Sequence, residues 1–377
     1  MKIIIAPDSF KGSISAQDLC ESIRGGIEAV VPSAEAVELP MADGGEGTLD
    51  ALIYATKGTK CECEVKDPLG RPVKASYGIM GDGQTVMIEM AQASGLTLLQ
   101  ESDRNPLITS SYGTGELIRR ALRAGYRKFV VGLGGSATND GGAGMLRALG
   151  ASFTDESGAQ IPEGGAGLAQ LSAIDLSGLD SAVRESAFRI AGDVTNPLCG
   201  PSGASSVFGP QKGATEEMVR RLDEALNRYG EVLLQVTGTD VRQMPGSGAA
   251  GGMGAALLAV LQAESGSGID LVMEAVDFED KLQGASMVIT GEGRLDRQTL
   301  SGKVIAGICR KARANQIPVI ALCGRMDLTA EEMDELGLTA AFSIVPGPCT
   351  LEEAMAGASL WARLRTEQIM RLYTMNR

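Results

Sequence analysis

The chain opens on a continuous apolar run. Residues 2–6 are mostly β-branched, which predicts a parallel strand buried on both faces. A polar loop follows, and Ser15 with Asp18 three residues later forms a helix-start signal. Apolar residues then recur at helical spacing until Pro32. We therefore predict a strand, a polar loop and a helix in this order.

The C-terminal third repeats this order. Residues 287–290 predict another buried strand, 291–302 a loop before a helix, and 318–322 the next strand. Two further helix starts carry a Thr with a Glu three residues later, namely Thr329 with Glu332 and Thr350 with Glu353. Regular alternation of strands and helices predicts a parallel sheet.

The middle of the chain has a different pattern. Residues 61–66, 72–79 and 85–90 alternate polar with apolar positions and are separated by turn signals, which predicts antiparallel hairpins. We therefore expect an α/β protein in which a second α/β domain is inserted into a Rossmann-like parallel-sheet domain. The Rossmann-like domain is expected to comprise 1–66 and 285–377, with 106–150 as a segment that it can also include, and the inserted domain 67–284.

The amino-acid composition limits the partners and the catalytic groups that this protein can use. The chain of 377 residues has 34 Lys and Arg against 47 Asp and Glu, a net charge of −13, and only 4% aromatic residues, which argues against a nucleic-acid partner. It has no histidine, so carboxylates, Lys, Tyr or Cys must perform any acid–base chemistry. The 50 glycines show no collagen period, and 44% of the residues are apolar, which indicates glycine-rich loops on a folded scaffold.

Cysteines and apolar segments indicate a cytoplasmic protein with no membrane partner. The seven cysteines are scattered and form no Cys-x-x-Cys pair, which is typical of a reducing compartment. Pro7 and Asp8 interrupt the N-terminal apolar run too early for a signal peptide. The longest weakly polar stretch, 249–263, is shorter than the ~20 residues that span a membrane.

Two loops that follow predicted strands carry charges of both signs. The first contains Asp8, Ser9 and Lys11, and the second contains Glu292, Arg294, Asp296 and Lys303. Ligands of open parallel sheets bind beyond the carboxyl ends of strands. Carboxylates there can hold Mg²⁺ while cations and backbone N–H groups hold phosphate. The alternative for each loop is an ordinary solvated turn with a helix cap.

Glycine-rich segments add further candidates. Residues 42–48 surround two acidic residues with glycines, 134–142 resemble an anion nest, and Asp193 ends a strand-like run. Residues 246–251 match G-x-G-x-x-G, but no clear strand precedes them, so they fit a phosphate cradle better than a dinucleotide site. Without histidine, phosphoryl transfer to a small molecule is the reaction that these residues suit best.

Six segments carry a family resemblance. They are IAPDSFK (5–11), ADGGEGT (42–48), GLGGSATNDGG (132–142), DVTNPL (193–198), FGPQKGA (208–214) and TGEGRLD (290–296). In sequence and order they resemble those of the type-1 glycerate kinases, across nearly the whole chain. The resemblance implies ATP-dependent phosphorylation of D-glycerate, usually to 2-phosphoglycerate, with Mg²⁺ and on a Rossmann-like domain joined to a second α/β domain.

Other readings stay open at this point. A kinase that forms 3-phosphoglycerate differs only in which hydroxyl is presented, and a two-domain protein that binds small organic acids would share the same architecture. A nicotinamide-dependent dehydrogenase would share the glycine-rich α/β character but lacks the fingerprint context. We expect D-glycerate and ATP as partners and a monomer or homodimer.

Residue roles follow from the loop argument and remain expectations. Catalytic roles are expected for Asp193, Asp43, Lys11 and Asp8. ATP is expected to contact Gly134, Gly135, Ser136, Gly248, Gly251, Glu292, Arg294 and Lys303. Substrate is expected at Ser9, Arg71, Asn196 and Lys212, and Mg²⁺ at Asp296 and Asp43. Because both substrates are anionic, at least two of Lys11, Arg71, Lys212, Arg294 and Lys303 should line one cleft.

Overall fold

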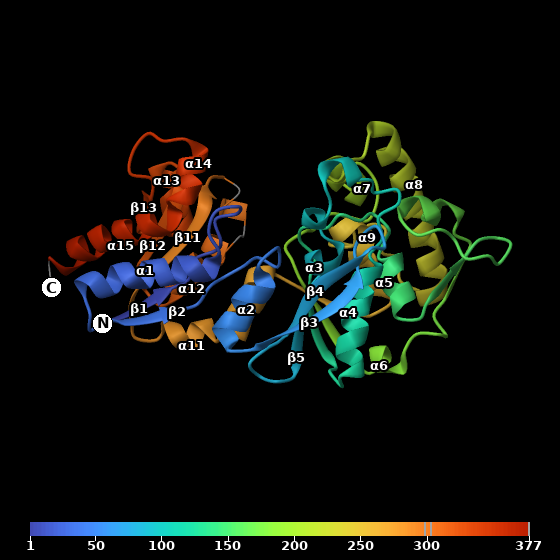
Figure 1. The fold of residues 1–377 in the computed structure, drawn as a ribbon, viewed down its shortest axis with the longest axis horizontal. Helices are drawn as coiled ribbons and strands as arrows, with labels where there is room; N and C mark the ends of the chain where they lie inside the picture. Colours follow the sequence, from blue (N-terminus) through green and yellow to red (C-terminus); the bar gives the residue numbers. More distant parts are fainter. Residues whose placement is uncertain (298, 302–303, 376–377) are drawn as a thin grey trace. The chain divides into compact units, whose positions relative to one another are not determined.

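The chain forms two units, each of which combines helices with a sheet (Figure 1). The computed structural model describes residues 1–297, 299–301 and 304–375. Unit 1 comprises Met1–Asp43, Asp50–Lys57 and Ile269–Arg377, and unit 2 comprises Gly44–Leu49 and Gly58–Gly268.

The limits of the units differ from the expected domain boundaries at 66/67 and 284/285, and the segment 106–150 lies in unit 2. Strand β3 (Thr59–Lys66) pairs along its whole length with β4 (Pro72–Ile79), which explains why it belongs to unit 2. The side chain of Ile269 lies against Gly307, which explains why unit 1 begins again before 285. The assignment of domains stays a prediction.

Unit 1 contains a five-stranded parallel sheet in the order β13-β12-β11-β1-β2. The strands are β1 (Lys2–Ile5), β2 (Glu35–Glu38), β11 (Ala285–Leu295), β12 (Val319–Met326) and β13 (Ala340–Ser343). The side chains of Ile3, Ile4 and Ile5 are fully buried, as the opening apolar run predicts. Counted along the chain, the strand order is 2-1-3-4-5, a doubly wound arrangement whose direction of progression reverses between β1 and β11. The expected parallel α/β architecture is confirmed.

Local signals set several helix starts in unit 1. Ser15 Oγ accepts a hydrogen bond of 3.1 Å from the Asp18 backbone N–H, which begins α1 (Ala16–Val30) as predicted. Capping boxes at Thr329 and Thr350 begin α13 (Ala330–Leu336) and α14 (Leu351–Ala356). The remaining helical segments are α11 (Phe278–Leu282), η5 (Thr299–Ser301), α12 (Val304–Ala314), α15 (Ala358–Thr374) and most of α2 (Thr48–Thr56) and α10 (Gly268–Ala275), whose first residues belong to unit 2. Helices α1 and α15 lie side by side (Figure 1).

One expectation about unit 1 is wrong. The sequence predicts a loop at 291–302, but β11 continues to Leu295. It does so because it pairs with β12 as far as Leu295 opposite Met326. The charged residues Glu292 and Arg294 are therefore fixed on a strand, whereas Asp296 follows it.

Unit 2 contains a mixed six-stranded sheet in the order β10-β9-β6-β5-β4-β3. Besides β3 and β4 its strands are β5 (Thr85–Glu89), β6 (Lys128–Gly132), β9 (Ala187–Ala191) and β10 (Glu264–Gly266). The predicted antiparallel hairpins are present, and β5 joins them to the rest of the sheet by pairing in parallel with β6. The short strands β7 (Ser152–Thr154) and β8 (Ala173–Asp175) form a separate antiparallel pair.

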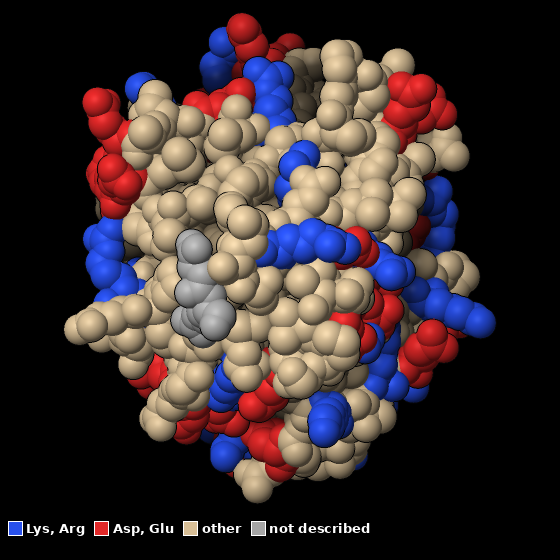
Figure 2. All heavy atoms as spheres, turned by 90° about the vertical axis from the view of Figure 1, so that its left-hand side faces the viewer, with Lys and Arg blue, Asp and Glu red and all other residues tan. Residues whose placement is uncertain are grey.

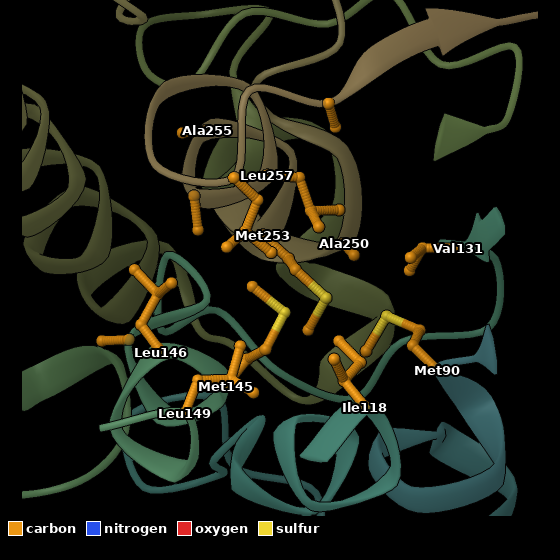
Figure 3. Packing of buried hydrophobic residues seen from close by; sticks show 14 of the residues in the cluster. Met90, Ile118, Val131, Met145, Leu146, Leu149, Ala250, Met253, Ala255 and Leu257 are labelled. Atoms are coloured by element: carbon orange, nitrogen blue, oxygen red, sulfur yellow. The ribbon is translucent and has the colours of Figure 1, made fainter. Parts of the chain in front are cut away.

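The core of unit 2 lies between this sheet and its helices. Met253 and Leu257 of α9 (Ala249–Ala259) lie among apolar side chains of α5 (Ala143–Ala148) and the sheet, such as Met145 and Val131 (Figure 3). The other helical segments are α3 (Ala91–Ser94), η1 (Leu96–Leu98), η2 (Glu101–Asp103), α4 (Tyr112–Arg123), η3 (Gly165–Gln170), α6 (Ser181–Arg184), α7 (Ala204–Phe208), η4 (Pro210–Lys212) and α8 (Glu216–Thr237).

Charges of both signs share the face of the chain that Figure 2 shows. Lys and Arg are interspersed with Asp and Glu there, and uncharged residues form much of the surface between them. Despite the net charge of −13, Lys and Arg side chains on this face can create local positive potential. In the described part of the chain, no helix has the length and apolar character that crossing a bilayer requires.

Candidate functional site

A cavity of about 640 Å³ lies in unit 1 beyond the carboxyl ends of its strands. Because the strand order reverses between β1 and β11, the chain leaves these neighbours toward opposite faces of the sheet and opens a crevice at their ends. Polar and charged lining residues are Asp8, Ser9, Lys11, Ser13, Asp43, Glu292, Arg294, Asp296, Thr299 and Arg325. Both charged segments, the loop after β1 and the end of β11, thus contribute side chains to one cavity.

Asp8 begins the loop that follows β1. Its backbone N–H donates to the Gly291 carbonyl at 2.9 Å, which holds the start of this loop beside β11. The Ser9 N–H donates to Asp8 Oδ1 at 2.7 Å. Burial and then the neighbouring Asp43 carboxylate raise the pKa of Asp8 to about 7, although the Ser9 hydrogen bond and Lys11 oppose this shift. Two carboxylates that repel each other in this way favour a cation between or beside them.

A hydroxyl group organises the end of β11. Thr299 Oγ1 donates to the Glu292 carboxylate and accepts a hydrogen bond of 3.2 Å from the Asp296 backbone N–H. The Thr299 N–H in turn donates to the Asp296 carbonyl at 2.9 Å. These contacts fix Glu292 and Asp296 on the same wall of the cavity, and no pattern in the sequence marks Thr299 for this role.

Cations also line the cavity. Lys11 is exposed, and Arg294 forms ion pairs with Asp327 at 2.7 Å and with Asp296 at 3.4 Å. Arg325 Nε donates to the other oxygen of Asp327 at 2.9 Å, and this hydrogen bond is the main reason why the pKa of Asp327 is lowered. Lys11 and Arg294 satisfy the expectation that two cations line one cleft. Lys303 lies outside the described residues.

Mg²⁺ fits this donor set only if phosphate completes its coordination. Among the described residues, no three Asp, Glu or Cys side chains gather closely enough to hold a metal ion by themselves. Mg²⁺ in phosphoryl-transfer sites is held by one or two carboxylates together with substrate phosphates and water. The carboxylates of Asp43 and Asp296 line the cavity and can serve in this way.

In unit 2, a buried lysine supports the glycine-rich loop 134–142. Lys212 is 1% exposed, and its Nζ donates to Ser136 Oγ at 2.8 Å and to the Thr138 carbonyl at 2.7 Å. Burial lowers the pKa of Lys212 to about 7, although the charge of Asp140 opposes this shift. The contacts give Lys212 a role in holding the loop, and its expected contact with substrate stays a prediction.

Asp140 occupies part of the expected anion nest. Its carboxylate accepts hydrogen bonds from the backbone N–H groups of Gly142 at 3.1 Å and Gly144 at 3.2 Å. Ser111 donates to it through both N–H and Oγ, each at 2.8 Å. Burial raises the pKa of Asp140, which these donors counteract. The N–H groups at the start of α5 thus bind an anion of the protein itself.

Glycines expected to contact ATP have packing roles in unit 2. A Cβ on Gly134 would lie 2.5 Å from Gly45 Cα, and one on Gly251 would lie 2.0 Å from the Thr138 carbonyl oxygen. Gly248 donates its N–H to the Asn196 carbonyl at 3.0 Å. Gly135 adopts φ of 73°. Close approach of backbones explains these residues, and binding of ATP by Gly134, Gly135, Ser136, Gly248 and Gly251 stays a prediction.

The remaining expected residues lie on loops of unit 2. Asp193 is exposed after β9, and Asn196 Nδ2 donates to the Ser202 carbonyl at 2.8 Å. Arg71 forms ion pairs with Asp67 at 2.6 Å and Asp103 at 3.3 Å. The Asp67 carboxylate also accepts backbone N–H groups of the β3–β4 turn, so these contacts give Arg71 a structural role, and its expected contact with substrate stays a prediction.

Comparison with known proteins identifies the family. Residues 3–374 match the description "Glycerate kinase family". The chain is 51% identical to a Bacillus subtilis glycerate kinase, over 95% of this chain and 94% of that protein, and 49% identical to an Escherichia coli glycerate 2-kinase with the same coverage. A crystal structure from Salmonella typhimurium LT2, described as a candidate glycerate kinase 2, is 48% identical with a TM-score of 0.90 and covers 100% of this chain and 99% of its own. The chain therefore belongs to the glycerate kinase family.

Proposed function

We propose that this protein transfers the γ-phosphoryl group of ATP to the 2-hydroxyl of D-glycerate and forms 2-phosphoglycerate. Membership of the family implies a kinase that uses ATP. The position of transfer is supported by the Escherichia coli relative, which is named a glycerate 2-kinase. The observation that carries the proposal is that carboxylates and cations from the loop after β1 and from the C-terminal end of β11 line one cavity.

In the proposed reaction, the 2-hydroxyl oxygen forms a bond to the γ-phosphorus while the bond from that phosphorus to the bridging oxygen breaks. ADP leaves with the bridging oxygen, and the hydroxyl proton passes to a carboxylate. Mg²⁺, when bound, neutralises charge on the phosphate oxygens. Asp43 and Asp296 would hold it, and Asp8 beside Asp43 adds negative charge that a cation offsets.

Asp193 is our first choice for the proton acceptor and Asp43 the second. Asp193 is exposed on a loop after β9, whereas the adjacent Asp8 and Asp43 form a pair better suited to a cation. Lys11 and Arg294 would stabilise phosphate or carboxylate oxygens, since both line the cavity. Ser9, Glu292 and Asn196 remain candidates for positioning the substrates.

Release of ADP in a coupled assay with D-glycerate and MgATP tests the proposal, and phosphorus NMR of the product identifies the hydroxyl that is phosphorylated. We expect turnover and a 2-phosphate signal. A 3-phosphate signal would reassign the position, and binding of D-glycerate without ADP release would favour a binding protein.

A further inference from the structure

One part of the cavity of unit 1 is lined by aliphatic side chains, which we call the apolar wall. The wall is formed by Ile344 and Val345, which follow β13, and by Leu351 and Ala354 of α14. Phosphates, Mg²⁺ and D-glycerate are polar or charged and offer no large apolar surface that could pack against this wall. The proposed reaction therefore leaves this part of the cavity unexplained.

Ile344 and the charged residues of the cavity follow different strands of the sheet. Asp8 follows β1 and Ile344 follows β13, and the order β13-β12-β11-β1 places three strand spacings between these two strands. At about 4.8 Å each, the spacings amount to roughly 14 Å. Arg325 of β12 lies between them in this order and also lines the cavity. Helix α14 also reaches the loop after β1, because Ser13 Oγ donates to the Met355 carbonyl at 2.8 Å. The aliphatic lining therefore extends from the turn after β13 to the edge of the charged loop.

The apolar wall is held in place by hydrogen bonds. Ser343 Oγ donates to the Gly324 carbonyl at 3.1 Å and accepts the Val345 N–H at 3.1 Å, which fixes the turn after β13. Thr350 Oγ1 accepts the Glu353 N–H at 3.2 Å, which fixes the start of α14. Leu351, the first residue of this helix, is nevertheless 75% exposed. A large aliphatic side chain that is held at a cavity and left in water suits a ligand that covers it.

We propose that this apolar wall binds the adenine ring of ATP, with the triphosphate directed toward the charged residues at the ends of β1 and β11. A nucleoside triphosphate has this polarity, with a flat apolar base at one end and the transferable phosphate at the other. A cavity of about 640 Å³ is also in the range that takes a ligand of this size and far exceeds a three-carbon acid. This assignment rests on the proposed function, because it takes ATP as the ligand.

Two substitutions test the wall directly. Leu351→Glu places a charge where the base would lie, and the side chain is exposed, so folding does not depend on it. Ala354→Trp fills the space from the same helix. The control is Leu372→Glu on α15, because Leu372 is 64% exposed and does not line this cavity. Titration calorimetry measures the Kd of each variant for ATP and for inorganic triphosphate, which has no base.

We expect Leu351→Glu and Ala354→Trp to weaken binding of ATP about tenfold, which corresponds to about 1.4 kcal/mol. Binding of inorganic triphosphate should stay within twofold in both, and Leu372→Glu should change neither. In the coupled assay the KM for ATP should rise and the KM for D-glycerate should not.

The proposal is overturned if the ATP Kd of both variants stays within twofold of the unsubstituted protein, if triphosphate weakens in parallel with ATP, or if the unsubstituted protein does not bind ATP. The proposed function can fail separately. If the variants lose ATP affinity as expected but D-glycerate is never phosphorylated, the adenine site stands and the choice of acceptor is wrong.

Discussion

The carboxylate of Glu89 accepts a hydrogen bond of 3.0 Å from the backbone N–H of Leu49. Its other oxygen accepts the Gly47 N–H at 3.3 Å. Glu89 is the last residue of β5 and is 1% exposed, whereas Leu49 lies in the first turn of α2. A buried side chain from a strand thus supplies an anion at the start of a helix, where the backbone N–H groups have no partner within the helix.

We expect Glu89→Gln to lower the free energy of unfolding by about 1–2 kcal/mol, because a hydrogen bond to a charged group is replaced by a weaker neutral one at a buried position. Urea unfolding followed by circular dichroism measures the change. Glu62→Gln in β3 is a suitable control, since Glu62 is exposed. Equal stability of the two variants would contradict a capping role for Glu89.

Lys212 makes stability depend on pH. Burial lowers the pKa of Lys212 from 10.5 to about 7. Between these values the unfolded chain binds a proton that the folded chain does not, so this residue makes stability rise with pH from about 7 upward and adds no slope below it. Relative to Lys212→Met, the free energy of unfolding should increase by up to about 1.4 kcal/mol per pH unit in this window.

Urea titrations of both proteins at about pH 6, 7.5 and 9 check this slope. Lys74→Met is the control, because Lys74 is exposed on β4 and its removal should leave the pH dependence unchanged. A difference between the unsubstituted protein and Lys212→Met that stays constant above pH 7 would show that Lys212 remains charged in the folded state.

Removal of the proposed proton acceptor should affect turnover more than binding. We expect Asp193→Asn to lower kcat by roughly 10²–10⁴-fold, since an amide cannot accept the hydroxyl proton, and to leave the KM for ATP within a few-fold. Steady-state kinetics at saturating MgATP measure both. A kcat within a few-fold of the unsubstituted enzyme would exclude Asp193 as the base, and Asp43 would then be the next candidate.

Substitution of Asp43 should change the Mg²⁺ requirement of the enzyme. We expect Asp43→Asn to raise the Mg²⁺ concentration for half-maximal activity about tenfold, because one anionic ligand is lost. Glu35→Gln, at the exposed start of β2, provides a control of equal charge change. An unchanged Mg²⁺ requirement, with activity lost at every concentration, would place Asp43 elsewhere in the reaction.

Local signals in the sequence predict much of this fold. The Ser15, Thr329 and Thr350 helix starts depend on residues within three positions, and the apolar run at 2–6 needs only its own composition to indicate burial. The extension of β11 to Leu295 depends on its pairing with β12, which is distant in the chain. Such pairing leaves no mark in the polar sequence of 291–295.

The sequence also predicts part of the candidate site, namely the residues whose position depends only on a neighbouring strand. Asp8 follows a predicted strand, and the carboxyl ends of parallel strands lie at one edge of the sheet, so its place at the cavity can be predicted. Three other acidic groups have no such signal. In the sequence, Glu89 looks like an ordinary strand residue, and Asp140 looks like one more polar residue of a glycine-rich loop. Asp327 follows a strand, and its partner Arg294 is 33 residues away in the chain. Their importance depends on burial and distant partners.

The pairing of β1 has a consequence for synthesis on the ribosome. Strand β1 pairs in parallel with β2 on one side, but its other neighbour, β11, begins only at Ala285. All of unit 2 is translated between β1 and β11. Unit 2 can therefore fold while Ile3, Ile4 and Ile5 still lack one of their two neighbouring strands. The growing chain therefore keeps one edge of β1 unpaired until β11 has been made, and an unpaired strand edge can pair with another chain in the meantime.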